Sequence, residues 1–336
     1  MYVGLDVHKR FNQATVVDGN GVVLRECTVQ NKDKELDRFL QTLAPGTKLA
    51  LEACSVWEPV YDFIQSKGLD VCLIHPKKTR LIAESRNKTD RNDATMIAQL
   101  LRANMVYRAY VPDKETRKLR FLVRHRKSLV KQKKYVKNKV HAILAREGIT
   151  HGLSDLFGKR GMTILENIPL RNENRFAVNQ LLDSLKSIKQ QIVEADEYIA
   201  IQSSGIREIE LLKTIPGIST YSAAVIYSEI ADIKRFSDWK KLCGYAGITS
   251  SVYQSGDTKR FGPISKQGSR MLRWILIQCV QHTVRKPNSA QKLYMRVLKK
   301  KGHKKAIVAA SRKLLVYIYI MLTQDKKFNE LRVNSA

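Results

Sequence analysis

The sequence predicts an α/β N-terminal domain, a helical arm and a mainly α-helical C-terminal domain. Residues 1–110 alternate between strand-like and helix-like hydrophobic periods. Residues 111–205 keep a helical period almost throughout, and residues 206–325 are again mostly helical, with 326–336 as a tail. We therefore expect three structural parts.

The N-terminal part is predicted to begin with three strands in hairpin order. Its strands are expected at 2–7, 14–17, 22–29, 49–53 and 71–74, and its helices at 36–43, after Pro59 and at 90–105. The Gly19-Asn20-Gly21 string is typical of a turn between strands. Three strands followed by alternating helices and strands are the pattern of an RNase H-like α/β domain.

The arm is predicted from a long basic amphipathic segment, Thr116–Arg146, which contains twelve Lys and Arg residues and no acid. A second helix, about 175–200, is expected to return antiparallel to it as a coiled-coil-like hairpin. Uncompensated cations on one helix favour contact with a polyanion over a merely solvated face. The candidate nucleic-acid ligands are Arg124, Arg126, Lys127, Lys131, Lys133, Lys134 and Lys137.

The C-terminal part is predicted to carry a second basic surface. Residues 258–324 contain sixteen Lys and Arg residues and no acid, and Lys259, Arg260, Lys266 and Arg270 are candidate nucleic-acid ligands. Ile215-Pro216-Gly217-Ile218 between two helical stretches resembles a helix-hairpin-helix, whose backbone N–H groups can bind phosphate. A simple helix–turn–helix packing unit explains the same string equally well.

Composition points to nucleic acid as the partner. The formal net charge is +29, from 60 Lys and Arg against 31 Asp and Glu. Five cysteines without CxxC spacing argue against a disulfide framework and a structural zinc site. No signal peptide is evident, and the apolar stretch 314–322 is too short to cross a bilayer. We expect a cytoplasmic protein, nucleoid-associated when active, with no membrane partner.

Four carboxylates stand at predicted element ends: Asp6, Glu52, Asp90 and Asp93. Asp6 and Glu52 close strands that would be neighbours, and Asp90 and Asp93 share one face of a helix start. Converging carboxylate oxygens suit Mg²⁺ or Mn²⁺, as phosphodiester chemistry requires. The alternatives are that Asp90 caps its helix after Thr89 and that Asp6 forms a turn. Lys88 is a candidate phosphate ligand or a loop cap.

Ser255 lies in a Gly-flanked polar segment close to several Lys and Arg residues. Serine is a weak nucleophile unless its proton is removed and the charge building on phosphate is neutralised. The segment is compatible with a nucleophile that faces phosphate, and also with a structural serine in a turn.

These motifs resemble transposases of the insertion-sequence-110 type, which include the pilin-gene DNA invertase. The resemblance covers nearly the whole chain. It rests on the strings at 4–9, 51–53, 57–59, 87–94, 215–218, 245–249, 253–256 and 264–268. The string at 87–94 and the Ser255-Gly256 loop, in this order and spacing, are quite specific.

The resemblance implies a RuvC-like domain whose DEDD tetrad is Asp6, Glu52, Asp90 and Asp93, and a C-terminal domain whose catalytic serine is Ser255. It further implies a composite site shared between protomers of a homodimer or homotetramer, a serine–phosphate intermediate, and guidance by a structured bridge RNA that pairs with DNA. The alternatives are a RuvC-like nuclease that cuts DNA junctions with metal-activated water, and a nucleic-acid-binding scaffold without catalysis.

Overall fold

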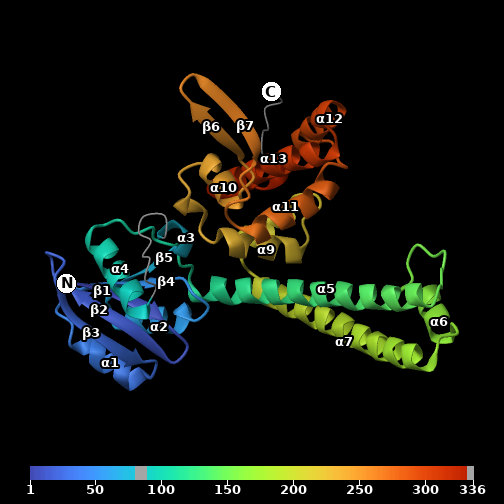
Figure 1. Cartoon of the computed structure of the whole chain (residues 1–336). Helices are drawn as coiled ribbons and strands as arrows, with labels where there is room; N and C mark the ends of the chain where they lie inside the picture. The colour runs from blue at the N-terminus through green and yellow to red at the C-terminus, as the bar shows by residue number, and fades with distance from the viewer. Residues whose placement is uncertain (80–88, 331–336) are drawn as a thin grey trace. The chain divides into compact units, whose positions relative to one another are not determined.

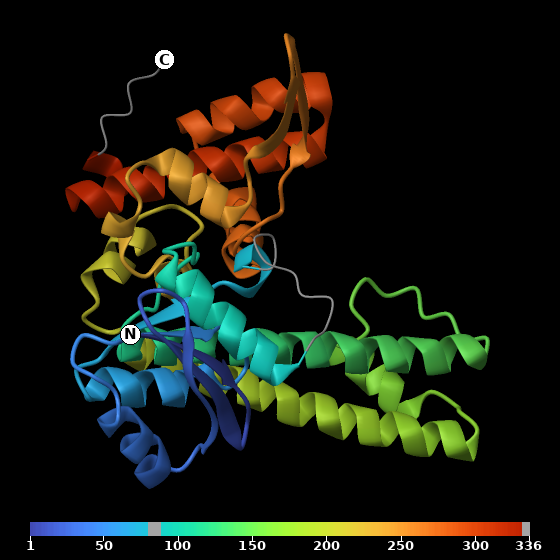
Figure 2. The same ribbon diagram turned by 60° about the vertical axis from the view of Figure 1, so that its left-hand side comes forward.

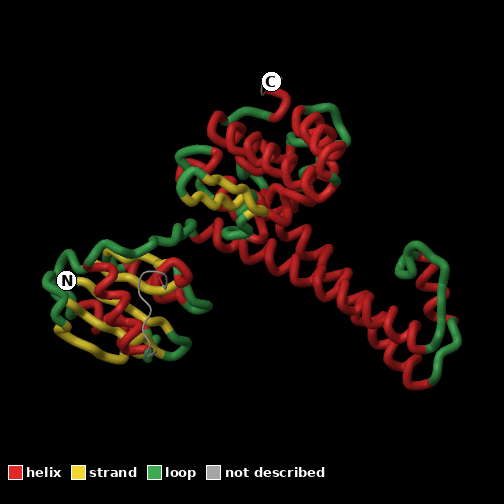
Figure 3. The backbone as a smooth tube through the Cα atoms, turned by 45° about the horizontal axis from the view of Figure 1, so that its top comes forward, coloured by secondary structure: helices red, strands yellow, loops and turns green. Residues whose placement is uncertain are grey.

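The computed structural model describes residues 1–79 and 89–330, and the chain divides into two compact units, Met1–Val111 and Pro112–Ala336. Figure 1 shows both units coloured along the chain, and Figure 3 shows their secondary structure.

The N-terminal unit is built on a five-stranded mixed sheet in the order β3-β2-β1-β4-β5. Its strands are β1 (Tyr2–Val7), β2 (Phe11–Val17), β3 (Val23–Gln30), β4 (Lys48–Glu52) and β5 (Asp70–Ile74). β1, β2 and β3 pair antiparallel, whereas β4 is parallel to both β1 and β5. This arrangement is consistent with the predicted RNase H-like domain.

Helices cover the two faces of this sheet with separate cores. α1 (Asp33–Gln41) and α2 (Trp57–Ser66) pack on the face that carries Val3, Leu5 and Leu51. α4 (Asp90–Arg102) packs on the other face, where Ile97 and Leu101 meet residues of β4 and β5. A short helix, α3 (Pro76–Thr79), follows β5. The acidic start of α4 is thereby held over one face of the sheet.

Gly4 allows α4 to lie directly on β1. A Cβ atom at Gly4 would lie 2.1 Å from the carbonyl oxygen of Ala94 and 2.5 Å from the backbone nitrogen of Ala98. Only a residue without a side chain permits that approach between helix and strand backbones. The glycine two residues before Asp6 therefore sets how closely α4 approaches the end of β1.

The second unit begins with the arm. α5 (Lys114–Arg146) and α7 (Asn172–Ser203) run side by side, as both Figure 1 and Figure 2 show. Val140, Leu144 and Leu185 lie in the hydrophobic core between the outer parts of these helices. α6 (Lys159–Asn167), which the sequence did not predict, joins this core through Leu165.

The C-terminal lobe shares one core with the base of the arm, because Leu119, Val123 and Ile199 pack among its helices. The remaining elements are α8 (Arg207–Lys213), α9 (Thr220–Ile230), the 3-10 helix η1 (Ile233–Arg235), α10 (Trp239–Ala246), β6 (Ser250–Ser255), β7 (Thr258–Ile264), α11 (Arg270–Thr283), α12 (Ser289–Lys301), α13 (His303–Gln324) and η2 (Phe328–Glu330). The hairpin of β6 and β7 was not predicted. Phe328, in the predicted tail, packs on this core.

Within the described parts of the chain, α13 is long and apolar enough to span a membrane by length and composition. Half of its apolar window is buried in the protein, and Leu314, Leu315 and Ile318 belong to the core of the lobe. Packing in that core accounts for its hydrophobicity.

The Pro216-Gly217 turn between α8 and α9 packs against α11. Gly217 has φ +92°, and a Cβ atom there would lie 2.6 Å from the Cβ of His282. The hydroxyl of Thr283 donates a 2.8 Å hydrogen bond to the carbonyl oxygen of Pro216. The turn therefore serves as a packing unit, and phosphate binding by its backbone N–H groups stays a prediction.

Candidate active site

The strand register brings Asp6 and Glu52 to the same end of neighbouring parallel strands. Leu5 of β1 pairs with Leu51 of β4, so the two acids stand one residue further along. Side chains alternate along a strand, so Asp6 shares the face of Gly4, which contacts α4. Glu52 is likewise on the face of Ala50, which packs in the α4 core.

The helix start above that face is capped by Thr89 and not by Asp90. Thr89 has extended backbone angles, and its hydroxyl accepts a 3.2 Å hydrogen bond from the backbone N–H of Asn92. Asp90 is the first residue of α4, and Asp93 also lies in its first turn. The capping explanation for Asp90 is therefore wrong, and its carboxylate is available for other contacts.

His8 joins the strand acid to the helix acid. Its Nε2 atom lies 3.1 Å from Oδ2 of Asp6 and 3.2 Å from Oδ2 of Asp90. The ligand atoms of Asp6, His8 and Asp90 all lie within 4.8 Å of one another. Phe11 packs against the imidazole with ring centroids 4.8 Å apart, and Asn31 donates a hydrogen bond to the His8 carbonyl oxygen. Phe11 and Asn31 thus hold the ring and the backbone of His8.

The electrostatics of this cluster favour a bound cation. Burial raises the pKa of Asp6, His8 opposes the rise, and the nearby Asp90 and Asp93 carboxylates raise it further. Positive charge placed among these groups would relieve both the desolvation and the mutual repulsion. In a chain with a net charge of +29, such a concentration of acids makes this cluster the candidate site for a cation.

The structure does not gather all four predicted acids into one ligand group. Glu52 and Asp93 lie outside the group formed by Asp6, His8 and Asp90, although Asp93 is close enough to act on the pKa of Asp6. Lys88 lies outside the described residues. Sequence reasoning missed His8, for which the available signal was a metal-ligating residue type two positions after a strand-end aspartate.

Ser255 lies in the second unit, at the tip of the β6–β7 hairpin. It pairs with Thr258 across a two-residue turn, and Gly256 at the first turn position has φ +54°. Ser255 is exposed, as are Lys259 and Arg260 on β7. Lys266 and Arg270, also exposed, follow at the base of the hairpin. The serine is therefore accessible to a macromolecular substrate.

Three of the predicted nucleic-acid ligands on α5 make contacts within the protein, and the Arg124 side chain also stays 55% exposed. Arg124 donates two hydrogen bonds, of 2.9 and 2.7 Å, to Oε1 of Glu229, which is 1% exposed. Arg126 forms a two-bond pair with Asp196 of α7, and its guanidinium lies 4.3 Å from the ring centroid of Tyr221.

Lys127 places its ammonium 3.8 Å from the ring centroid of Trp274. Further along α5, Lys137 lies over the ring of Phe157, whereas Lys133 is half-buried and Lys131 and Lys134 are exposed. The charge count along α5 could not reveal these pairs because the acids and aromatic rings come from distant segments. Lys131 and Lys134 remain exposed candidates for contact with nucleic acid.

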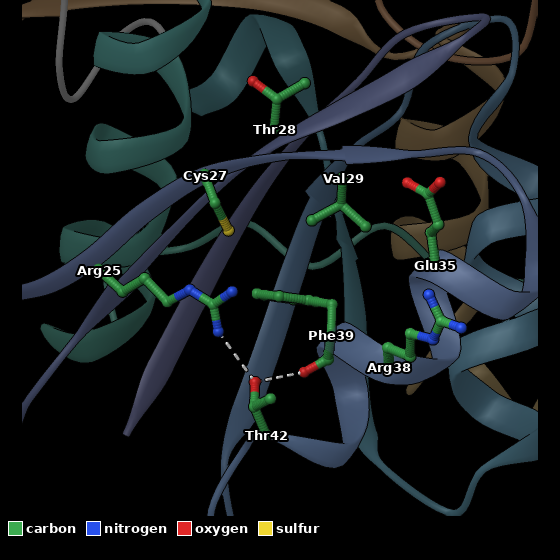
Figure 4. A pocket seen from close by; sticks show the side chains of 8 residues that line it. All are labelled: Arg25, Cys27, Thr28, Val29, Glu35, Arg38, Phe39 and Thr42. Atoms are coloured by element: carbon green, nitrogen blue, oxygen red, sulfur yellow. Dashed lines mark hydrogen bonds between the residues drawn. The ribbon is translucent and has the colours of Figure 1, made fainter.

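A pocket of about 300 Å³ lies between β3 and α1 (Figure 4). Its lining residues are Arg25, Cys27, Thr28, Val29, Glu35, Arg38, Phe39 and Thr42. Arg25 donates a hydrogen bond to the hydroxyl of Thr42. Because α1 and α4 cover opposite faces of the sheet, this pocket is separate from the Asp6, His8 and Asp90 cluster.

Comparison with known proteins assigns both units to transposases. A family model described as "Transposase", of the IS110 DEDD type, matches residues 3–148. A model described as "Transposase IS116/IS110/IS902 family" matches residues 209–295.

Individual relatives agree with these models. The transposase for insertion sequence element IS1111A of Coxiella burnetii is 25% identical over 336 residues, covering 97% of this chain and 90% of the relative. The pilin gene-inverting protein of Moraxella bovis is 25% identical over 342 residues, 98% of each chain. The transposase for element IS1328 of Yersinia enterocolitica is 26% identical over 247 residues, 74% of this chain and 73% of the relative. This chain belongs to the IS110 family of transposases and is a DNA recombinase.

Proposed function

We propose that this transposase cleaves and exchanges DNA strands through a covalent bond between Ser255 and a DNA phosphate. Acidic residues of the RuvC-like N-terminal unit would complete the site. The proposal rests on two features together: an exposed serine at the tip of a basic hairpin in one unit, and an acidic cluster with His8 in the other unit. Neither feature is needed to build the core of its unit.

The acidic cluster suits a divalent metal ion. Two carboxylates and an imidazole already place their ligand atoms within 4.8 Å of one another, Asp93 is close enough to act on the pKa of Asp6, and Glu52 closes the neighbouring strand at the same end of the sheet. Hard oxygen donors favour Mg²⁺ or Mn²⁺. When bound, such an ion would supply Lewis-acid stabilisation of charge on the phosphate and the leaving oxygen.

The serine step conserves the energy of the phosphodiester bond. The Ser255 hydroxyl loses its proton and its Oγ bonds to phosphorus, while the bond from phosphorus to one deoxyribose oxygen breaks and that oxygen takes up a proton. Attack by a deoxyribose hydroxyl on the serine–phosphate bond then rejoins strands and releases the serine. No external energy source is needed, which suits strand exchange.

The proposed partners follow from charge and family. DNA ends and target DNA would lie along the exposed cations of α5 and the hairpin. A structured bridge RNA would supply sequence recognition by base pairing. Because the serine and the acids lie in different units, we propose that protomers of a homodimer or homotetramer share the site. The proposed location is the cytoplasm.

The test replaces the nucleophile. Ser255→Ala is expected to abolish both DNA cleavage and the covalent protein–DNA adduct, detected as a shifted band on a denaturing gel with labelled DNA. Ser250→Ala, an exposed serine at the base of the same hairpin, serves as the matched control and should retain both. Continued cleavage by Ser255→Ala would instead support a junction nuclease that uses water activated at the acidic cluster.

A further inference from the structure

The β6–β7 hairpin presents two chemically different faces, and its register decides which residues share the face of Ser255. The cross-strand pairs are Ser255 with Thr258, Gln254 with Lys259, Tyr253 with Arg260 and Val252 with Phe261. Paired residues point to the same side, and sides alternate along each strand. Ser255, Thr258, Tyr253 and Arg260 therefore share one face. Lys259, Gln254, Phe261 and Val252 occupy the other.

Arg260 is the cation on the serine face. It stands diagonally across the strands from Ser255, a relation that places Cβ atoms about 7 Å apart, within reach of a long side chain. Both residues are exposed, so a phosphate can approach them together. A guanidinium can hold two phosphate oxygens at once, which suits it to this position.

Tyr253 leaves the space beside Ser255 open. A Cβ atom at Gly262 would lie 3.2 Å from Cε2 of Tyr253, so the tyrosine ring lies against Gly262, toward the base of the hairpin. Gly262 is two residues after Arg260 on the same strand, on the side away from the tip. The ring consequently does not fill the gap between Arg260 and the serine.

Lys259 is turned to the opposite face. Its ammonium lies 5.6 Å from the ring centroid of Phe261, the neighbouring residue on that side. Adjacent cations in the sequence are therefore divided between the two faces of the hairpin, and only one of them shares the face of the nucleophile.

We propose that Arg260 is a catalytic residue that binds the nonbridging oxygens of the phosphate attacked by Ser255. This role rests on the proposed serine chemistry. As Oγ bonds to phosphorus and the deoxyribose oxygen departs with a proton, negative charge builds on the nonbridging oxygens, and the guanidinium neutralises it. Lys259 contributes only general attraction for DNA.

The experiment compares Arg260→Ala with Lys259→Ala, using two DNA substrates that differ at the scissile position. One carries the natural phosphodiester and the other a methylphosphonate, which lacks the negative charge. On the phosphodiester, Arg260→Ala should slow adduct formation about 100-fold or more, the effect of losing one donor to a developing oxyanion. Lys259→Ala, which removes only general attraction, should slow it no more than it weakens equilibrium DNA binding. On the methylphosphonate, Arg260→Ala should come within about 3-fold of the unmodified protein, because a methyl group replaces the charged oxygen and the transition state carries one unit less of negative charge to be neutralised.

The role of Arg260 is overturned by equal losses for the two variants on the phosphodiester, or by an undiminished defect of Arg260→Ala on the methylphosphonate. Failure of the serine mechanism is recognised separately, in the same assay, by cleavage that persists in Ser255→Ala. Equilibrium DNA binding, measured in parallel, shows whether a slower rate reflects weaker association alone, which would also overturn the role.

Discussion

At the start of α4, the residue that caps the helix determines whether Asp90 bonds to the helix backbone or contacts the acidic cluster. Thr89 accepts the hydrogen bond from Asn92 that an N-cap must accept, so Asp90 need not turn back toward the backbone. Its carboxylate meets His8, which also contacts Asp6. Because the Thr89 hydroxyl caps α4, the Asp90 carboxylate can contact His8, which follows β1.

His8 is expected to be a ligand of the bound cation, since its Nε2 atom faces both carboxylates. His8→Ala should weaken Mn²⁺ binding about 10-fold or more and Mg²⁺ binding less, because imidazole nitrogen favours transition metals over Mg²⁺. Isothermal titration calorimetry of the metal-free protein measures both affinities. His141→Ala, an exposed histidine of the arm, is the control and should leave them unchanged. Equal weakening for the two metals would argue against a nitrogen ligand.

At the scale of elements, the site depends on how closely α4 lies on β1. The contact is between backbones, because Gly4 faces the carbonyl oxygen of Ala94 and the nitrogen of Ala98. A side chain there would push the helix away, and Asp90 would move with it. The glycine two residues before Asp6 is therefore as much a part of the site as the acids are.

Gly4→Ala should destabilise the N-terminal unit by roughly 1–3 kcal/mol, the usual cost of overpacking, and should also weaken metal binding. Thermal unfolding and metal titration measure the two effects. Gly19→Ala is the matched control, because a Cβ atom at Gly19 meets nothing within 4 Å and should change neither quantity. Normal metal affinity in a destabilised Gly4→Ala protein would show that the acids do not need this approach.

Whether a strand could be predicted from the sequence depends mainly on whether one of its faces is buried. The strands β1, β2, β4 and β5 were predicted because their apolar residues are buried, although β2 begins at Phe11, before the predicted start at 14. In β3, Val23 and Leu24 are 42% and 54% exposed, and the turn string before it supported the prediction. The β6–β7 hairpin was missed because both of its faces are exposed: Val252, Tyr253 and Phe261 are 49%, 67% and 70% exposed. Alternation of apolar and polar residues is a signal only where one face is buried.

The candidate site was predictable in its acids but not in its contacts. The ends of β1 and β4 and the start of α4 could be located from periodicity. This placed four acids at predicted element ends: Asp6, Glu52, Asp90 and Asp93. The pairing of His8 with two of them depends on the turn after β1, where the backbone N–H of His8 donates to the carbonyl oxygen of Phe11. The pair of Arg124 with Glu229 joins residues 105 apart in the chain, beyond the range of any local pattern.

At the scale of the whole molecule, the proposed catalytic groups are divided between two units. The acids belong to Met1–Val111, whereas Ser255 belongs to Pro112–Ala336, which is built around the arm and the C-terminal lobe. This division allows a serine from one protomer to act with acids from another. A closed oligomer with twofold symmetry would then contain two equivalent sites, each drawing on both chains.

Mixing two inactive variants tests that sharing. Asp6→Asn and Ser255→Ala are each expected to be inactive alone, because each removes one half of every site. If the halves come from different protomers, co-expressed variants should recover about a quarter of the adduct formed by the unmodified protein, since random mixing pairs intact acids with an intact serine in one site of four. The measurement is the labelled adduct on a denaturing gel, with size-exclusion chromatography to establish that mixed oligomers form. Mixed oligomers with no recovered adduct would instead place the serine and the acids of each site in one chain.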